Sequence, residues 1–475
     1  MKVLKFGGTS VQNAEAIQNV VRIIQSKRPS PLLIVVSACA GVTNALLALV
    51  QFLRDGKTSE ARVLLHDVRQ RHKVIADDLL EGEVSLKFNE QLEKDCAELE
   101  REVRSFHRQG ILESTSDAVV SFGERWSSQF LFSSLVQQEI PSEFIDSRDL
   151  LVTNNEFTKA TPFFEETNAR VQKFLTPHLE QGKVIVTQGF VGSTVDGLTT
   201  TIGRGGSDYS ASIFGAALGA EEIEIWTDTD GILSADPRLV PEAVSLREIS
   251  TEEATELAHF GAKVVHPSTL APATDAKIPV KILNSFRPHF EGTLIRPVNG
   301  SSRPEEFGVK SITGKKGVCT VAIRKNKRMN KFHFLQHVFH VLENHKEVVE
   351  FISSSETGVL VLTNDEEDHR PFLEELRHHE SVEIREELAI LSVVGNFDGN
   401  DRPISSQVHD ILREGEIPFY LAYNGVSTHS HSVVIDGKRL EEGLSLLHRR
   451  FIGEQAGLRA EGERGLRLVI PGSRV

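Results

Sequence analysis

A lysine near the start of the chain stands just before two glycines and two hydroxyl residues. Residues 3–11 read VLKFGGTSV, an apolar run that stops at Gly7 and Gly8. This pattern predicts a buried strand that turns into a helix, with glycines that let the backbone approach a ligand closely. Amides at the start of a helix favour anions. Lys5 and the amides of Gly7 and Gly8 could therefore hold a phosphate, although a Gly-Gly turn by itself is usually structural.

A second glycine-rich segment combines an arginine, a serine and an aspartate in front of a helix of small residues. It reads TTTIGRGGSDYSAS over 199–212. Arg204 offers a two-pronged donor for a carboxylate, and Asp208 adds a positioned acid at the helix start. Ser207 or Asp208 would also serve as the N-cap of that helix. Capping does not explain Arg204 or the three glycines, so this segment is the strongest candidate for a ligand site.

Two further segments carry hydroxyl and charged residues beside small ones. VVSACAGVTN, over 35–44, is a strand end with a glycine and two hydroxyl residues, Ser37 and Thr43. SFGERWSS, over 121–128, places Glu124 directly after a glycine. Both segments are shaped for the close approach of a ligand to the backbone.

An aspartate-rich loop and a late lysine complete the candidates. WTDTDGILSADPR, over 226–238, follows a short apolar run and interleaves aspartates with glycine and proline. It is a poor calcium loop, because an EF-hand needs a glutamate near the place where Arg238 stands. A loop that faces a nucleotide is the better interpretation. AKVVHP, over 262–267, adds Lys263 as a second cation for phosphate. The chain has no GxxxxGK[ST] motif, so a nucleotide site must be built differently from a P-loop.

Composition argues against several classes of function. The 53 basic and 67 acidic residues give a net charge of −14 without a basic block, which argues against a nucleic-acid partner. The three cysteines lie far apart without CxxC spacing, and the paired histidines at 378–379 and at 429 and 431 have no cysteine or carboxylate at ligand spacing. We therefore expect no metal site. No leader-like segment and no apolar run of about 18 residues is present, so we expect a cytoplasmic protein.

The elements that must position these residues change character along the chain. Residues 1–296 alternate apolar runs with helical stretches, which predicts a mainly parallel sheet with helices on both faces. Within them, 59–139 is charged and rich in helix formers, which predicts a helical subdomain. The segment around 297–310 has the proline, glycine and serine content of a linker. Beyond it, the order β-α-β-β-α-β occurs twice, which predicts two small α+β modules.

The motifs together carry a resemblance. KFGGTSV, VVSACAGVTN, SFGER, GRGGSDYSA, WTDTDGI with DPR, and AKVVHP occur in this order and resemble the aspartate kinase family of the amino-acid kinase superfamily. The resemblance covers essentially the whole chain, and the repeated modules resemble the paired ACT domains of the lysine-inhibited, monofunctional type. It implies a three-layer αβα catalytic domain over 1–296, a linker over 297–310, ACT modules over 311–384 and 385–460, and a tail over 461–475.

The resemblance also implies a reaction. Aspartate kinases use MgATP to phosphorylate the β-carboxylate of L-aspartate to 4-phospho-L-aspartate, the first step toward lysine, threonine and methionine. A carboxylate is already an anionic nucleophile, so no general base is needed, and none of the motifs contributes a candidate histidine base. A kinase for another amino-acid carboxylate and a catalytically silent amino-acid sensor are the alternatives. The expected cofactors are ATP and Mg²⁺, with the metal held largely by phosphates and water, and the expected assembly is a homodimer or larger.

By similarity, each motif residue receives a role. Lys5 and Asp208 are catalytic, with Lys5 on the transferred phosphoryl group. The substrate residues are Ser37, Thr43, Glu124, Arg204 and Ser207, with Glu124 on the amino group and Arg204 on a carboxylate. The nucleotide residues are Lys5, Gly7, Gly8, Thr227, Asp228, Asp230, Asp236, Arg238 and Lys263.

The implied effector site departs from the family pattern. Its expected residues are Met329, His333, Phe334, Val349, Glu350 and Ser354. The chain reads NKFHF over 330–334, where lysine-sensitive members usually have Gly-Phe, and it has Glu350 where they usually have an aspartate. Glu350 could still hold the amine of an effector, while His333 crowds the turn that would meet its carboxylate. L-Lysine is the favoured effector, and threonine or a loss of sensitivity are the alternatives.

Overall fold

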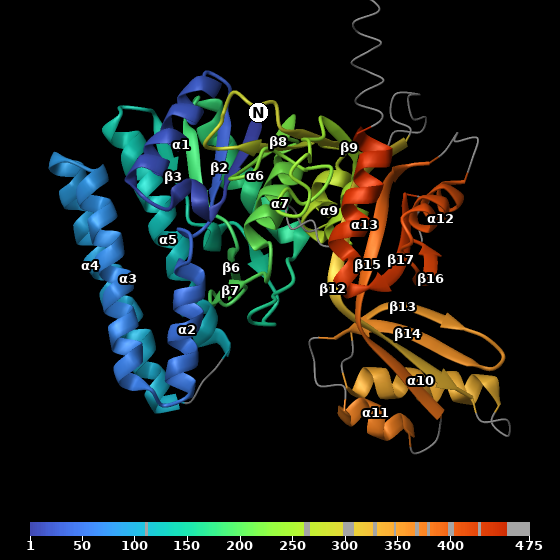
Figure 1. The fold of residues 1–475 in the computed structure, drawn as a ribbon. Helices are drawn as coiled ribbons and strands as arrows, with labels where there is room; N and C mark the ends of the chain where they lie inside the picture. Colours follow the sequence, from blue (N-terminus) through green and yellow to red (C-terminus); the bar gives the residue numbers. More distant parts are fainter. Residues whose placement is uncertain are drawn as a thin grey trace, which may run out of the picture. The chain divides into compact units, whose positions relative to one another are not determined.

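The computed structural model describes residues 1–109, 113–260, 267–297, 308–325, 330–345, 348–365, 370–377, 381–397, 403–425 and 429–453 (Figure 1). They fall into two compact units. Unit 1 comprises Met1–Ile232, Ser245–Ala254 and Lys263–Val298, and unit 2 comprises Leu233–Val244, Thr255–Ala262 and Asn299–Val475. No helix in the described ranges is long and apolar enough to cross a membrane.

Unit 1 is built on an eight-stranded sheet with the order β3-β5-β2-β1-β8-β10-β11-β9. Its strands are β1 (Lys2–Phe6), β2 (Leu32–Val36), β3 (Ser142–Phe144), β5 (Val184–Gln188), β8 (Glu222–Thr227), β9 (Glu248–Ser250), β10 (Val280–Asn284) and β11 (Thr293–Arg296). All neighbours pair in parallel except β10 with β11. β2 and β5 are buried along their whole length, as parallel strands covered by helices require. The predicted mainly parallel α/β fold is confirmed.

Helices and a small second sheet surround these strands. The helices are α1 (Ala14–Lys27), α2 (Val42–Arg54), α3 (Thr58–Leu79), α4 (Gly82–Gln109), α5 (Glu113–Gln137), α6 (Phe164–Glu180), α7 (Gly206–Leu218), α8 (Thr251–His259) and α9 (Pro267–Asp275). The small sheet has β4 (Val152–Thr153), β6 (Val191–Thr194) and β7 (Thr199–Thr201) in the order β4-β6-β7. The helical stretch expected over 59–139 is present as α3, α4 and α5, and Figure 1 shows α3 and α4 side by side.

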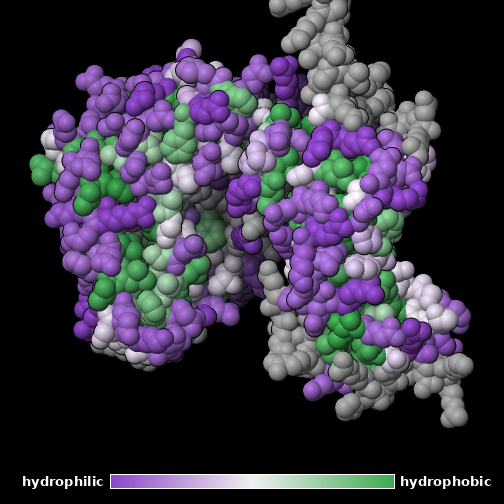
Figure 2. Space-filling view, in the orientation of Figure 1, coloured by the Kyte–Doolittle hydropathy of each residue, from purple (hydrophilic) through white to green (hydrophobic). Residues whose placement is uncertain are grey.

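The face of unit 1 that Figure 2 draws is mostly polar. On the face drawn in Figure 2, hydrophilic residues predominate and hydrophobic ones form small separate areas. Val63 and Val74 on α3 and Leu86 on α4 are among the exposed apolar side chains. Single apolar residues on a surface are ordinary, so they do not define a binding face.

Unit 2 is built on a six-stranded antiparallel sheet with the order β13-β14-β12-β15-β17-β16. Its elements are β12 (Gly308–Arg324), α10 (Lys331–Asn344), β13 (Val349–Ser354), β14 (Gly358–Asn364), α11 (Arg370–Arg377), β15 (Ser381–Asn396), α12 (Ile404–Glu414), β16 (Phe419–Asn424), β17 (Ser430–Asp436) and α13 (Leu440–His448). One core gathers α10 and α11 and another gathers α12 and α13 along the same two long strands, β12 and β15 (Figure 1).

The two modules of unit 2 are interleaved instead of consecutive. β12 and β15 are each long enough to run through both cores, and they pair along their whole length. Val309 and Ile312 of β12 pack with α12 and α13, in the core of the second module. The strand expected after α13 is therefore supplied by the first half of β12. β12 also begins at Gly308, inside the predicted linker over 297–310, whose residues 298–307 lie outside the described ranges.

Two segments assigned to the catalytic domain by sequence belong to unit 2. Residues 233–244 and 255–262, which the prediction places in the catalytic domain over 1–296, fall in unit 2. The amide of Ile312 donates to the carbonyl of Ser234 over 2.8 Å, and the hydroxyl of Thr313 donates to the carbonyl of Phe260 over 3.0 Å. These bonds join residues distant in sequence, which a local pattern does not reveal.

Candidate active site

The candidate site of unit 1 lies at the carboxyl ends of its central strands. β5, β2, β1 and β8 are adjacent and parallel, so the loops that follow them meet at one edge of the sheet. Backbone bonds join these loops: the Gly7 amide donates to Trp226 over 2.9 Å, and the Ala40 amide donates to Gly8 over 3.0 Å. The loops that carry the motifs KFGGTS and VVSACAGVTN are therefore joined by a backbone hydrogen bond and lie side by side.

Lys5 and Asp208 form an ion pair at this edge. The Nζ atom of Lys5 lies 2.6 Å from Oδ1 of Asp208, and their side chains are only 10% and 13% exposed. Asp208 stands in the first turn of α7, whose N-cap Gly205 has φ of +73°. A left-handed backbone there favours glycine, which explains part of the glycine content of GRGGSD. The pair fixes the ammonium group of Lys5 close to a helix start, which itself favours anions.

Glu124 is a buried carboxyl group beside this pair. It is 3% exposed, and its Oε2 atom has no hydrogen-bond partner among the described residues. Burial raises the pKa of Glu124 to about 8, although the backbone N–H of Ala38 and the charge of Lys5 act to lower it. A buried oxygen without a partner is rare in a folded protein. It is suited to receive an ammonium group from a ligand.

Small residues seat α5 directly on the loop that follows β2. A Cβ atom at Gly123 would lie 2.8 Å from Cβ of Ala38, which is too close for any larger residue. The hydroxyl of Ser127 donates to the carbonyl of Ser37 over 2.6 Å. This close packing brings Glu124 to the site. Ser37 itself is half-buried, and so is Thr43 in the first turn of α2.

The loop before α7 brings the other predicted substrate residues to the same edge. Arg204 is exposed between Gly203 and Gly205, both with positive φ. Ser207 is 8% exposed and packs against Gly189, where a Cβ atom would lie 2.6 Å from Cβ of Ser207. Gly189 was missed by sequence reasoning, although a glycine directly after the apolar run KVIVTQ was the available signal.

Three of the predicted nucleotide residues lie at and after the end of β8. Thr227 ends β8, and its hydroxyl donates to Oδ1 of Asp228 over 3.2 Å. Asp230 accepts from the side-chain amide of Asn284 over 2.8 Å and pairs with Arg287, so its carboxylate fastens the loop to the end of β10. Within the protein, this carboxylate is therefore already engaged.

Of the remaining three nucleotide candidates, two belong to unit 2 and one is outside the described residues. Asp236 and Arg238 fall in unit 2 and bind each other, with Nε to Oδ1 at 3.0 Å and Nη2 to Oδ2 at 2.6 Å. Lys263 lies outside the described residues. The roles of all three toward a nucleotide stay predictions.

The predicted effector residues of unit 2 differ in exposure. His333, Val349 and Ser354 are exposed, Phe334 is buried in the core of the first module, and Met329 lies outside the described residues. Glu350 has a side chain that is only 3% exposed. It contacts Nζ of Lys315, and Nε2 of His259 lies 3.5 Å from its second oxygen. Lys315 thus contacts the carboxylate of Glu350, which was expected to bind the amine of an effector.

No group of three or more histidine, cysteine, aspartate or glutamate side chains in the described ranges has a geometry that could hold a metal ion. A magnesium ion bound to a nucleotide needs few protein ligands, because phosphates and water complete its shell. The site is therefore compatible with a metal that arrives with its nucleotide.

Comparison with known proteins gives a consistent picture. The family model described as "Amino acid kinase family" matches residues 1–284. The chain is 32% identical over 454 residues to the lysine-sensitive aspartokinase 3 of Escherichia coli, covering 94% of this chain and 98% of that protein. It is also 32% identical over 464 residues to the chloroplastic bifunctional aspartokinase/homoserine dehydrogenase 2 of Zea mays, covering 94% of this chain but only 50% of that protein.

A solved structure agrees with these sequence matches. The chain resembles the crystal structure of E. coli aspartokinase III in complex with aspartate and ADP, with a TM-score of 0.79 and 31% identity. The match covers 94% of this chain and 99% of that one.

Proposed function

The chain belongs to the amino acid kinase family and, within it, to the aspartokinases, and we propose that it transfers the γ-phosphoryl group of MgATP to the β-carboxylate of L-aspartate. One observation supports this proposal most strongly. The Lys5–Asp208 ion pair lies beside Glu124, whose buried Oε2 has no partner among the described residues. The site thus offers a cation for a phosphoryl group and an acceptor for an amino group.

The proposed reaction needs positioning and charge neutralisation, and no base. A β-carboxylate oxygen of aspartate attacks the γ-phosphorus, the bond from phosphorus to the bridging oxygen of ADP breaks, and ADP leaves with that electron pair. No proton moves, because the attacking carboxylate is ionised near neutral pH. Lys5 would neutralise charge on the phosphoryl oxygens while Asp208 holds its ammonium group in place. Mg²⁺, bound to ATP, would supply positive charge to the phosphate oxygens.

Glu124 and Arg204 would bind the two ends of the amino acid that do not react. The ammonium group of aspartate would meet Oε2 of Glu124, and the α-carboxylate would meet the guanidinium of Arg204. Because burial raises the pKa of Glu124 to about 8, the free protein keeps this group largely protonated at pH 7. Binding of the ammonium group favours the carboxylate, so binding would release a proton. Ser37, Thr43 and Ser207 would add hydrogen bonds.

Regulation, assembly and location are parts of the same proposal. The E. coli relative is named as lysine-sensitive, and we extend this property to the ACT-like modules of unit 2, with L-lysine as the favoured effector. We propose a catalytic domain over 1–296, a homodimer or larger assembly, and a cytoplasmic location.

The test is ADP release from MgATP with L-aspartate, with L-glutamate and without an acceptor, with hydroxylamine present to trap an acyl phosphate. Aspartate-dependent hydroxamate is the expected result. If hydroxamate forms with L-glutamate instead, the acceptor is L-glutamate and the proposed substrate is wrong. A folded protein that binds ATP but forms no hydroxamate from either acid would be a silent sensor, and the proposal would be wrong.

A further inference from the structure

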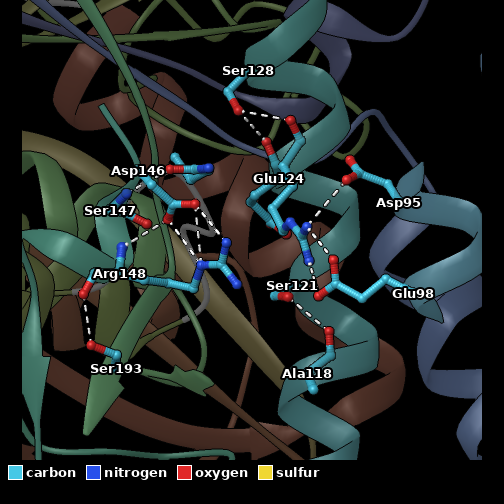
Figure 3. A network of polar contacts seen from close by, with 12 residues as sticks. Asp95, Glu98, Ala118, Ser121, Glu124, Ser128, Asp146, Ser147, Arg148 and Ser193 are labelled. Atoms are coloured by element: carbon cyan, nitrogen blue, oxygen red, sulfur yellow. Dashed lines mark hydrogen bonds and ion pairs between the residues drawn. The ribbon is translucent and has the colours of Figure 1, made fainter. Parts of the chain in front are cut away.

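A buried ion-pair network stands directly behind Glu124. Arg125 follows Glu124 on α5, and successive side chains of a helix point about 100° apart. While Glu124 meets the loop after β2, Arg125 faces α4. There its Nη1 and Nη2 atoms donate to the two oxygens of Glu98 over 3.1 and 3.0 Å, and Nη2 also donates to Oδ1 of Asp95 over 3.2 Å. Figure 3 shows Asp95 and Glu98 directed from α4 toward α5.

The guanidinium of Arg125 is held on several sides. Its Cζ atom lies 4.1 Å from the ring centroid of Phe122, and its side chain is only 10% exposed. Asp95 also accepts from the side-chain amide of Gln91 over 2.8 Å. Burial raises the pKa of Asp95 even though Arg125 lowers it, while the hydrogen bonds from Arg125 lower the pKa of Glu98. A buried pair of this kind adds little net stability over an apolar contact, but its fork geometry fixes orientation.

A second ion pair, between Arg148 and Asp146, lies near this network. Arg148 binds both oxygens of Asp146, with Nη2 to Oδ2 at 2.7 Å, and its carbonyl accepts from the hydroxyl of Ser193 over 2.6 Å (Figure 3). The charges of Arg125 and Arg148 both act on Glu98. The acidic residues of α4 therefore face two arginines on unit 1 elements that border the site.

The helical hairpin of α3 and α4 has a second anchor on the site. Nη1 of Arg71 on α3 donates to the carbonyl of Ala40 over 2.7 Å, and Nη2 donates to the carbonyl of Gln12 over 3.3 Å. Ala40 belongs to the loop after β2, and Gln12 follows the glycine turn after β1. The hairpin thus contacts the loops after β1 and β2 through Arg71, and it contacts α5, the helix of Glu124, through Arg125.

We propose that Arg125, fixed by Asp95 and Glu98, is a positioning residue that sets the rotation of α5 and so aims the carboxyl group of Glu124 at the substrate amine. The inference rests on the proposed function, because it assigns Glu124 to the amino group of aspartate. Arg125 touches no substrate. It acts through its neighbour, and the α3–α4 hairpin is the support against which it acts.

The test compares Arg125→Met, Arg125→Lys and Glu98→Gln with a matched control, Arg69→Met. Arg69 also forms an ion pair between α3 and α4, with Glu93, but it does not contact α5 in that pair. In Arg125→Met we expect the KM for aspartate to rise about tenfold or more, with the KM for ATP within about twofold of the wild type. In Arg125→Lys and Glu98→Gln the KM for aspartate should lie between the values of the wild type and of Arg125→Met. A lysine keeps the charge but cannot reproduce the two parallel hydrogen bonds of a guanidinium. Arg69→Met should leave both KM values unchanged.

A pH profile separates positioning from a general loss of structure. Glu124 faces Lys5 from β1 and lies near Cys39 from the loop after β2, and burial raises its pKa to about 8. If loss of Arg125 lets Glu124 turn toward water, the rise of kcat/KM for aspartate with pH should move to lower pH in Arg125→Met. A variant that only loosened the protein would lower kcat or the unfolding temperature without moving that limb.

The outcomes decide between the two proposals. If the wild type makes no hydroxamate, the proposed function fails before any variant is measured. If the wild type is active and the KM for aspartate and its pH profile are unchanged in folded Arg125→Met, the positioning role is wrong. If Arg125→Met does not fold, Arg125→Lys and Glu98→Gln decide by the same criteria. Equal rises of the KM values for aspartate and ATP would also overturn the inference.

Discussion

The ammonium nitrogen of Lys5 lies 2.6 Å from a carboxylate oxygen of Asp208, so β1 and the first turn of α7 meet in one ion pair at the carboxyl edge of the sheet. Two glycine-rich segments separated by most of unit 1 in sequence are brought together by this contact. It gives the site a cation whose position is fixed before a ligand arrives.

Removal of that cation should abolish most activity. We expect Lys5→Ala to lower kcat by about 10²- to 10³-fold, because a phosphoryl group in transfer would lose its fixed positive charge. Asp208→Asn should lower kcat less, because the lysine remains but is no longer held. Lys2→Ala is the matched control, since Lys2 lies on the same strand but pairs with Glu222 and Glu224. Hydroxamate formation measures all three, and an active Lys5→Ala protein would refute the assignment.

Neutralising Glu124 should weaken aspartate binding selectively. We expect Glu124→Gln to raise the KM for aspartate about 10- to 100-fold and to leave the KM for ATP nearly unchanged. In the wild type, kcat/KM for aspartate should rise with pH through about 8, because the carboxylate form of Glu124 grows over that range. The variant should lack this limb. Glu113→Gln, an exposed change on the same helix, serves as control. If kcat/KM for aspartate still rises with pH through about 8 in Glu124→Gln, another group causes the rise.

A buried histidine of the hairpin should make the protein sensitive to acid. His72 is fully buried against Trp126 and Phe130, and burial lowers its pKa to about 4. Because the folded pKa lies below the unfolded value, stability is present above pH 6.5 and is lost as pH falls toward 4. From pH 7 to pH 5 the loss should be about 2 kcal/mol.

The measurement is urea unfolding of His72→Leu and wild type at both pH values. The difference between the two proteins isolates His72 from Glu124, whose raised pKa acts in the opposite direction between pH 4.5 and 8. His66→Leu, an exposed change on the same helix, is the control. An equal loss in wild type and His72→Leu would show that other groups cause the acid sensitivity.

Lys315 should compete with L-lysine for Glu350. Because its ammonium already contacts the buried carboxylate, we expect Lys315→Met to lower the L-lysine concentration for half-inhibition by about tenfold, an order-of-magnitude value for one charge-assisted hydrogen bond. Lys316→Met is the control, since Lys316 pairs with Glu441 and is half exposed. Kinase assays with increasing L-lysine measure the effect. Unchanged inhibition in Lys315→Met would separate Glu350 from the effector site.

Sequence predicted the parts of the site that depend on local motifs. Lys5 before two glycines and Asp208 at a glycine-rich helix start carry their chemistry in residue type and spacing, and the structure brings them together. The mainly parallel sheet also followed from the alternation of apolar runs and helices. The contribution of Ala38 could not be predicted, because it is a backbone amide, and any residue type supplies one.

Features that depend on distant pairings were missed. Nothing near Arg125 in the sequence names Asp95 and Glu98 as its partners, because they lie on another helix about 30 positions earlier. The transfer of 233–244 to unit 2 depends on bonds such as that between Ser234 and Ile312. The division of β12 between two cores likewise depends on its pairing with β15, and the apolar pattern of one strand does not show where its partners change.

The two long shared strands make the regulatory half of the chain mechanically continuous. β12 and β15 each cross from one core to the other, so separation of the two modules would cut both strands. The pair should unfold in a single cooperative transition. A displacement produced by a small molecule at one module would be carried to the other along both strands, through the irregular pairing between Lys316 and Thr320.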